Sequence, residues 1–377
     1  MKRIDVSRLR MLPLASRKHK LRIEEIAVGL EGPAPTLLDA HAAQVERCAE
    51  RIRRARANGR PVILTFGAHF IKNGLGPLAG RLVREKWITH LATNGAGAIH
   101  DWEFAFIGQS TEDVRVNTAN GCFGTWDETG KYTHLSVAAG GPEGLGYGEA
   151  VGRMICEERL DLPEPELLRE SIARRMRSKS DPDEIEAAAA EADLLFLMER
   201  WGIPSGRMEL PHPWRKYSLQ AAAYEAGVPF TVHPGIGYDI IYTHPMACGG
   251  AIGRAALRDF HAYAASVAEL SGGVHLAVGS SVMAPMIFEK ALSMANNAAL
   301  AAGESAVRDH YLVVVDIQDG GGWDWRSGEP PMSHPAYYLR FCKTFYRMGG
   351  ELDYIQMDNV AFLTAVARQL LGNGFTT

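Results

Sequence analysis

Two segments between Pro61 and Asp101 join an apolar run to a glycine-containing loop. VILTF is followed by GAHFIKNG, and ITHLAT is followed by NGAGAIHD. Glycine allows the backbone to turn with positive φ and places no Cβ in the path of a ligand. A phosphate can therefore reach the free N–H groups at the start of the next helix. These loops predict a nucleotide-binding site in an α/β sheet.

Comparable loops follow the other apolar runs, and together they contain the candidate binding residues. Ligands of open parallel sheets bind beyond the carboxyl ends of the strands, which is where such loops lie. No loop has the spacing G-x-G-x-x-G, so the standard dehydrogenase fingerprint is absent. The candidate residues are Gly67, Ala68 and His69; Thr93, Asn94, Gly95 and Gly97; His233, Gly235, Gly237 and Asp239; Gly279 and Ser280; Asp316 to Gly322; and Asp358 with Asn359.

The features of these loops also have purely structural explanations. A single glycine often does no more than permit a tight turn between a strand and a helix. Asp316 ends the apolar run YLVVVDI, a position from which an acid accepts hydrogen bonds from ribose in dinucleotide folds. Asp239 and Asp358 occupy similar positions, but either could instead cap the helix that follows it.

The composition indicates an enzyme of the cytoplasm that does not cross a membrane. The chain has 377 residues, of which 22% are charged, and its net charge of −4 does not favour nucleic acid as a partner. The five cysteines form no CxxC pair, so neither a disulfide framework nor a thiolate zinc site is predicted. The sequence contains no run of about 18 apolar residues, and its first residues lack the apolar core of a secretory signal.

The hydrophobic pattern predicts an α/β fold. Apolar residues repeat with alternating periods of two and 3.6, which is typical of strands and helices that take turns around a mostly parallel sheet. We expect a Rossmann-like sheet with helices on both faces, in a single domain over residues 36–377. Residues 120–210 are interpreted as a mainly helical insertion, with helix throughout 164–201. The glycine-rich stretch 121–148 within it could form a lid.

Residues 1–35 are interpreted as an N-terminal arm. Residues 1–22 contain eight lysines and arginines and one acid, Asp5. Such a segment could be a targeting peptide or an arm that binds anions. Short basic termini are common, and this one has little helical periodicity, so we expect a solvated arm that rests on a neighbouring subunit.

Several segments resemble deoxyhypusine synthase in order and spacing, from about residue 36 to the end. They are TFGAHFIKNG, ATNGAGAIHD, VHPGIGYDIIYTHP, LAVGSS, VVDIQDGGG and YIQMDNVAF. In that family these segments form a Rossmann-like domain that binds NAD, and the enzyme is a homotetramer with sites at a subunit interface. The resemblance therefore implies NAD as cofactor and an oligomer, with NAD contacts from Ala68, Thr93, Asn94, Gly95, Gly235, Asp239, Asp316, Ile317, Asp358 and Asn359.

The family uses a lysine that forms an imine with an aminobutyl group, and the matching position is Lys343 in HPAYYLRFCKTFY. Only about one lysine in 10³ is neutral at pH 7 when its pKa is near 10.4, so the site must lower that pKa. If residues 335–348 form one helix, Lys343 lies away from the apolar stripe, and such a lysine is usually solvated. Lys72 and Lys290 are the competing lysines.

The chain differs from the family at the positions where the family binds its polyamine. It reads MAPMIFEK at one such segment, and no acidic cluster surrounds PAYYLRF. Because a trication needs carboxylates, we expect another small-molecule amine as the substrate, or one that is not a polyamine, rather than the hypusine-bearing translation factor. Histidines stand at other family positions: His69, His100 and His233.

Three functional classes follow from these residues. The first is an NAD-dependent transferase that acts on an amine through transient hydride transfer, with His69 or His233 as the base, His100 in reserve and Asp239 as a further catalytic candidate. The second is a metal-dependent hydrolase in which His69, His100 and His233 converge at the strand ends and bind zinc, although no HExxH-type spacing supports it. The third is a non-catalytic oligomer that binds NAD.

Overall fold

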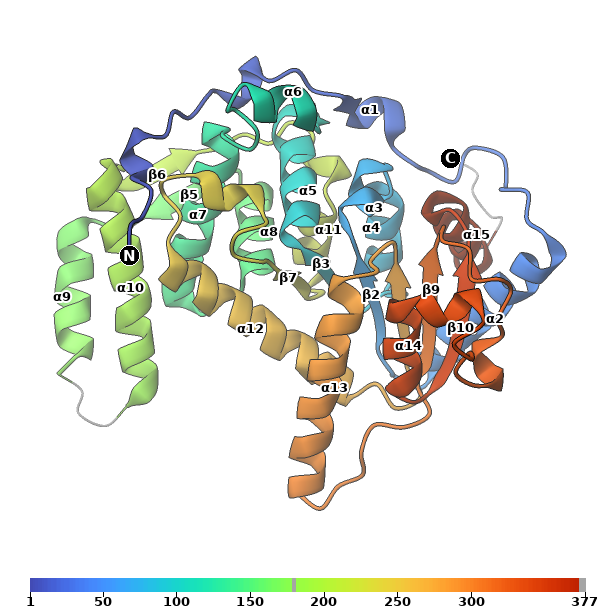
Figure 1. Ribbon diagram of the computed structural model, residues 1–377. Helices are drawn as coiled ribbons and strands as arrows, with labels where there is room; N and C mark the ends of the chain where they lie inside the picture. Colours follow the sequence, from blue (N-terminus) through green and yellow to red (C-terminus); the bar gives the residue numbers. More distant parts are fainter. Residues whose placement is uncertain (178–180, 373–377) are drawn as a thin grey trace.

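Six parallel strands form the central sheet of the computed structural model, which describes residues 1–177 and 181–372 (Figure 1). Their order across the sheet is β10-β9-β8-β2-β3-β7, and every neighbouring pair is parallel. This sheet confirms the predicted α/β class. The strands are β2 (Val62–Phe66), β3 (His90–Asn94), β7 (Phe230–His233), β8 (Val274–Val278), β9 (Tyr311–Asp316) and β10 (Glu351–Gln356).

Helices cover both faces of the sheet, as the continuous apolar runs of the strands predict. Alternate strand residues point to opposite faces: Leu64 and Val313 belong to one apolar cluster, and Ile63 and Leu312 to the other. The first cluster packs against α2 (Asp39–Ala57), α4 (Gly76–Arg84), α5 (Gly95–Ile107), α11 (Leu219–Ala226) and α15 (Asn359–Leu371). The second packs against α12 (Gly249–Ala268), α13 (Met283–Ala301) and α14 (Arg340–Arg347).

Helices also dominate the segment between β3 and β7, which Figure 1 shows beyond the β7 edge of the sheet. This segment holds α6 (Val114–Ala119), α7 (Asp127–Gly140), α8 (Tyr147–Glu157), α9 (Pro165–Arg175) and α10 (Pro182–Trp201), with a small sheet of β5 (Arg159–Leu162) and β6 (Gly206–Glu209). The expectation of a lid at 121–148 is wrong, because residues 133–140 of α7 are buried in the core. The prediction of helix throughout 164–201 is wrong, because α9 ends at Arg175 and α10 begins at Pro182, after the N-cap Asp181. Residues 178–180 lie outside the described residues.

Shorter elements complete the chain. They are β1 (Leu21–Arg22), β4 (Gln109–Ser110), α1 (Ile23–Ile26), α3 (Ala68–Lys72) and the 3₁₀ turns η1 (Val6–Arg8), η2 (Leu14–Ser16), η3 (Gly141–Glu143), η4 (Arg215–Tyr217), η5 (Ile240–Thr243), η6 (Trp325–Ser327) and η7 (Pro335–Tyr338). Among the helices of the described ranges, we find none with the length and apolar character that crossing a bilayer requires.

The N-terminal segment packs on its own chain. Figure 1 shows it running from the side of α10 across to α1 and then to α2. The Arg17 guanidinium is buried and donates to both carboxylate oxygens of Glu103 on α5, at 2.8 and 2.5 Å. β1 then pairs with β4. The expectation of a solvated arm resting on a neighbouring subunit is therefore wrong for residues 12–26.

The expected helix over residues 335–348 is interrupted. η7 ends at Tyr338, and Leu339 has φ −73° and ψ 76°, outside the helical region. α14 begins only at Arg340. Angular positions calculated for one continuous helix therefore do not describe how Lys343 lies relative to Tyr338.

Loss of the Arg17 guanidinium should destabilise the protein strongly. Arg17→Ala leaves the Glu103 carboxylate buried without its partner, and breaking a buried pair in this way costs about 3 to 5 kcal/mol. Urea denaturation followed by circular dichroism measures the change. Arg10→Ala removes an exposed arginine of the same segment and should change the free energy of unfolding by less than about 0.5 kcal/mol. Equal effects of the two variants would contradict the structural role of Arg17.

Candidate functional site

The strand order defines a topological switch point at the carboxyl edge of the sheet. From β2 the chain adds β3 and β7 on one side, and it then returns to add β8, β9 and β10 on the other. The direction of winding therefore reverses between β2 and β8. Ligands of doubly wound sheets bind at this switch point, outside the carboxyl ends of the strands. In this chain the two loops that meet there contain Gly67 and Gly279.

The loops after β2 and β8 approach each other so closely that Gly67 cannot carry a side chain. A Cβ built on Gly67 would lie 2.5 Å from the carbonyl oxygen of Gly279. Gly279 has φ +61°, and its N–H donates to the carbonyl of Val315 at 2.9 Å. No side chain caps α3, which begins directly after Gly67. The two loops thus present bare backbone at the switch point.

A carboxylate of the protein itself occupies the N-terminus of α5, which the sequence suggested as a phosphate site. Asp239 accepts hydrogen bonds from the N–H groups of Gly235, at 2.7 Å, and of Ala96. A Cβ on Gly95 would collide with this carboxylate. The Asn94 side chain accepts from the N–H of Gly97. Burial raises the pKa of Asp239 to about 6, although its hydrogen bonds act in the opposite direction.

Three further predicted residues bond to backbone or side chains at the same edge. Asp316 accepts from the N–H of Gln318, and Asp358 accepts from the first N–H groups of α15. Asp358 is thus a helix cap, one of the two roles considered for it. The Asn359 side chain accepts from Asn73 at 2.8 Å, which connects the loop after β10 to the end of α3.

The remaining predicted residues of the edge lie in the loops without contacting a common centre. The Thr93 hydroxyl donates to the carbonyl of Phe66 at 2.9 Å, which joins the ends of β3 and β2. Ala68 begins α3, and Gly237 turns its loop with φ +100°. Three apolar side chains project outward from the edge: Ile236, Tyr238 and Ile317 are at least 71% exposed. Such side chains are available to a planar ligand or to another chain.

The structure does not bring the three histidines together. His233 is buried on the α12 side of the sheet, where it bonds to Thr231 and packs against Tyr263, and burial lowers its pKa to about 3. His100 bonds to Ser110, and burial lowers its pKa to about 4. Over residues 1–177 and 181–372, no three His, Cys, Asp or Glu side chains form a group that could hold a metal ion.

The three candidate lysines have different surroundings. The Lys343 amine lies 3.5 Å from the centroid of the Tyr337 ring, as in a cation–π contact. Lys290 is exposed and pairs with Glu289. Lys72, the last residue of α3, is half-buried and has no hydrogen bond or ion pair with a described residue. Burial, with a smaller contribution from Lys20, lowers the pKa of Lys72.

His69 lies one turn before Lys72 on α3 and is exposed. Partial burial of its ring, together with the charge of Lys72, lowers the pKa of His69. Both residues also lower the pKa of His100. From the sequence, Lys72 is only an alternative to Lys343 as the nucleophile. No sequence pattern indicates that a lysine is buried without an acidic partner.

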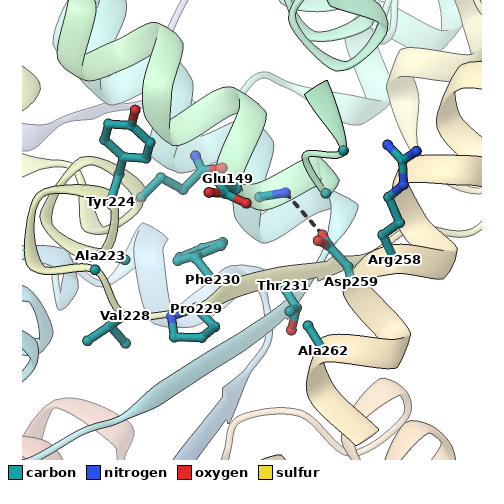
Figure 2. A pocket seen from close by; sticks show the side chains of 15 residues that line it. Glu149, Ala223, Tyr224, Val228, Pro229, Phe230, Thr231, Arg258, Asp259 and Ala262 are labelled. Atoms are coloured by element: carbon teal, nitrogen blue, oxygen red, sulfur yellow. Dashed lines mark hydrogen bonds between the residues drawn. The ribbon is translucent and has the colours of Figure 1, made fainter. Parts of the chain in front are cut away.

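A separate cavity of about 340 Å³ lies against the edge strand β7, away from the switch point at the carboxyl edge. Figure 2 shows Asp259 in its wall beside Arg258, with Phe230 and Thr231 of β7. Asp259 accepts from the N–H groups of Val232 and of Gly148 at the start of α8. Burial raises its pKa to about 8. Because Asp259 satisfies backbone donors of an edge strand and a helix start, its role is accounted for by the fold.

Comparisons with known proteins give no assignment at the level of sequence. No protein-family model matches the chain, and no curated protein matches it. Similar solved structures include AgrE in a ternary complex with ornithine and NAD⁺, at 16% identity and a TM-score of 0.42. The match covers 89% of this chain and 34% of AgrE, so the chain spans about a third of the length of that protein.

Two further solved structures are similar over most of the chain. One is a proposed LOR/SDH protein from Methanococcus maripaludis S2, at 14% identity and a TM-score of 0.41, covering 92% of this chain and 72% of that one. The other is a proposed deoxyhypusine synthase from Entamoeba histolytica, at 10% identity and a TM-score of 0.37, covering 89% of both chains. TM-scores of this size carry no inference about the activity or ligands of this chain.

The Lys72 amine should lose its proton at a lower pH than an ordinary lysine. Its folded-state pKa is lowered because the charged form is partly desolvated near other cations. Acetylation with limiting reagent from pH 7 to 11, followed by peptide mass spectrometry, gives the midpoint of its reactivity. The same lysine in the urea-unfolded chain serves as the control and should titrate near about 10.4. Coincident midpoints would show that the folded site leaves the amine unperturbed.

Proposed function

We propose that this chain is an NAD-dependent transferase that acts on a small amine through transient hydride transfer, as its resemblance to deoxyhypusine synthase implies. The observation that carries the proposal is the doubly wound parallel sheet, with bare glycine backbone at its switch point between β2 and β8. Dinucleotides bind at such switch points because the backbone can approach the diphosphate closely. Cytoplasmic location and a homotetramer with sites at a subunit interface belong to the same proposal.

The residues at the carboxyl edge are suited to hold NAD. Gly67 allows the loops after β2 and β8 to approach each other, because a Cβ there would meet the carbonyl oxygen of Gly279. Asp316 and Asp358 accept hydrogen bonds from local N–H groups, and a carboxylate retains further lone pairs for ribose hydroxyls. When bound, the nicotinamide would supply the hydride acceptor and donor. We propose contacts from Gly67, Ala68, Thr93, Asn94, Gly95, Gly97, Gly235, Gly237, Asp239, Asp316, Ile317, Asp358 and Asn359.

Two side chains are suited to accept a proton near neutral pH. Asp239 has a pKa near 6, which suits a general base better than an ordinary carboxylate does. His69 is exposed, and its lowered pKa keeps its imidazole neutral. His233 remains a candidate from the sequence, but its ring already bonds to Thr231 and faces α12. We therefore favour Asp239 and His69 over His233 for proton transfer.

The lysine nucleophile is proposed at Lys343, with Lys72 as the alternative. An amine attacks only when neutral, so the reacting lysine must be desolvated or lie near other cations. The Lys343 amine lies against the Tyr337 ring, in a cation–π contact. A second subunit covering α14 would change this environment. Lys72 has the required surroundings within one chain.

Replacing Gly67 should weaken NAD binding. Gly67→Ala places a methyl group against the carbonyl of Gly279, and the loops must separate to accept it. We expect the Kd for NAD, measured by isothermal titration calorimetry, to rise about tenfold or more. Gly32→Ala is the matched control, because open space surrounds that position. Unchanged affinity in a folded Gly67→Ala variant would remove the switch point as the NAD site.

Borohydride reduction should trap an adduct on one lysine. The protein is incubated with NAD and a panel of di- and polyamines, reduced, digested and analysed by mass spectrometry. We expect an adduct in the unaltered protein that is lost in Lys343→Ala and retained in Lys290→Ala. An adduct on Lys72 instead would move the nucleophile to α3. NAD binding without any adduct would support the non-catalytic oligomer, and absence of NAD binding would end the proposal.

A further inference from the structure

Besides the cavity beside β7, another cavity lies at the end of the sheet opposite the carboxyl edge, where the NAD site is proposed. It has a volume of about 680 Å³ and lies where β8 and β9 begin, at Val274 and Tyr311. Three segments that are distant in the sequence form its wall: the end of α2, the turn 271–273 and the loop 305–309. No motif in the sequence marks this cavity.

Arginines dominate the charge of the cavity wall. Arg51, Arg54, Arg60 and Arg308 line it, whereas Asp309 is the one acidic residue in the lining. The guanidinium of Arg51 lies over the Tyr311 ring and pairs with Glu351, and Arg60 pairs with Glu269 at 3.7 Å. Arg54 and Arg308 are exposed, and their guanidinium groups have no bond or ion pair with a described residue. In a chain of net charge −4, this is a local excess of positive charge.

The backbone that carries these arginines is anchored. The N–H of Arg308 donates to the Ser271 hydroxyl at 3.1 Å, which joins two of the three segments. The carbonyl of Arg60 accepts from Arg56 at 2.9 Å. At Gly273 a Cβ would lie 2.6 Å from the carbonyl oxygen of Pro61, so the turn 271–273 packs directly on the residue before β2. Only the arginine side chains need to be ordered when a ligand binds.

We propose that this cavity binds a small anion that carries at least two phosphate groups. Guanidinium groups match phosphate oxygens with paired N–H donors, and two of the four here are free to do so. The volume is within the range of small-molecule sites, roughly 300 to 1,000 Å³. The five residues of β8 separate it from the switch point by about 17 Å. The ligand is therefore distinct from a dinucleotide bound at the carboxyl edge.

Isothermal titration calorimetry with inorganic pyrophosphate tests the proposal, both without NAD and with saturating NAD to fill the proposed NAD site. We expect binding of pyrophosphate to the unaltered protein, and weaker or no binding of citrate at equal concentration. Arg54→Ala and Arg308→Ala should each raise the Kd about tenfold or more. Arg53→Ala, which removes the neighbouring exposed arginine of α2 outside the cavity, should leave the Kd unchanged.

The outcomes separate this site from the proposed NAD site. Three results would overturn the proposal: NAD abolishes pyrophosphate binding, pyrophosphate binding survives loss of both Arg54 and Arg308, or citrate binds as tightly as pyrophosphate. Arg54→Ala and Arg308→Ala should bind NAD as the unaltered protein does. Gly67→Ala should bind pyrophosphate normally. Failure of NAD to bind at all therefore leaves this test intact, because the arginine variants are compared in the absence of NAD as well.

Discussion

Buried carboxylates that receive the first N–H groups of distant helices hold the helical layer to the sheet. Asp101, on α5, accepts from the N–H groups of Leu219 and Gln220 at the start of α11. Asp259 does the same for α8, and Asp239 for α5. A helix N-terminus has unsatisfied N–H donors, and a buried carboxyl oxygen there accepts hydrogen bonds that these donors would otherwise lack. Each contact fixes one helix against another segment, and the positions of the helices in turn fix the loops at the carboxyl edge of the sheet.

This arrangement also decides where an anionic ligand can bind. The N-terminus of α5 directly follows β3 and contains Gly95 and Gly97, which by itself makes it an attractive phosphate site. Asp239 already supplies the negative charge there, and it accepts the N–H of Ala96. The backbone between Gly67 and Gly279 has no such internal anion. Within the proposed NAD complex, the diphosphate is therefore assigned to the β2–β8 switch point, and Asp239 is left for other parts of the ligand or for proton transfer.

The sequence predicted the sheet well because most of the strands are largely apolar runs followed by glycine- or acid-containing segments. These signals are local. The sequence could not predict that His233 faces α12, because its surroundings depend on which helices cover that face of the sheet. The break at Leu339 could not be predicted because neither glycine nor proline marks it: Tyr338 precedes it and Arg340 follows it. The burial of Arg17 was missed because its partner, Glu103, lies 86 residues away and no local pattern connects them.

The anchoring of the N-terminal segment has a consequence for the order in which the protein is made. Arg17 leaves the ribosome early, yet its binding partner belongs to α5, and Thr129 of α7 completes the same carboxylate's hydrogen bonds. Arg17 therefore has no partner until the 86 residues up to Glu103 have followed it from the ribosome. This segment docks only after the later residues that bind it have been made.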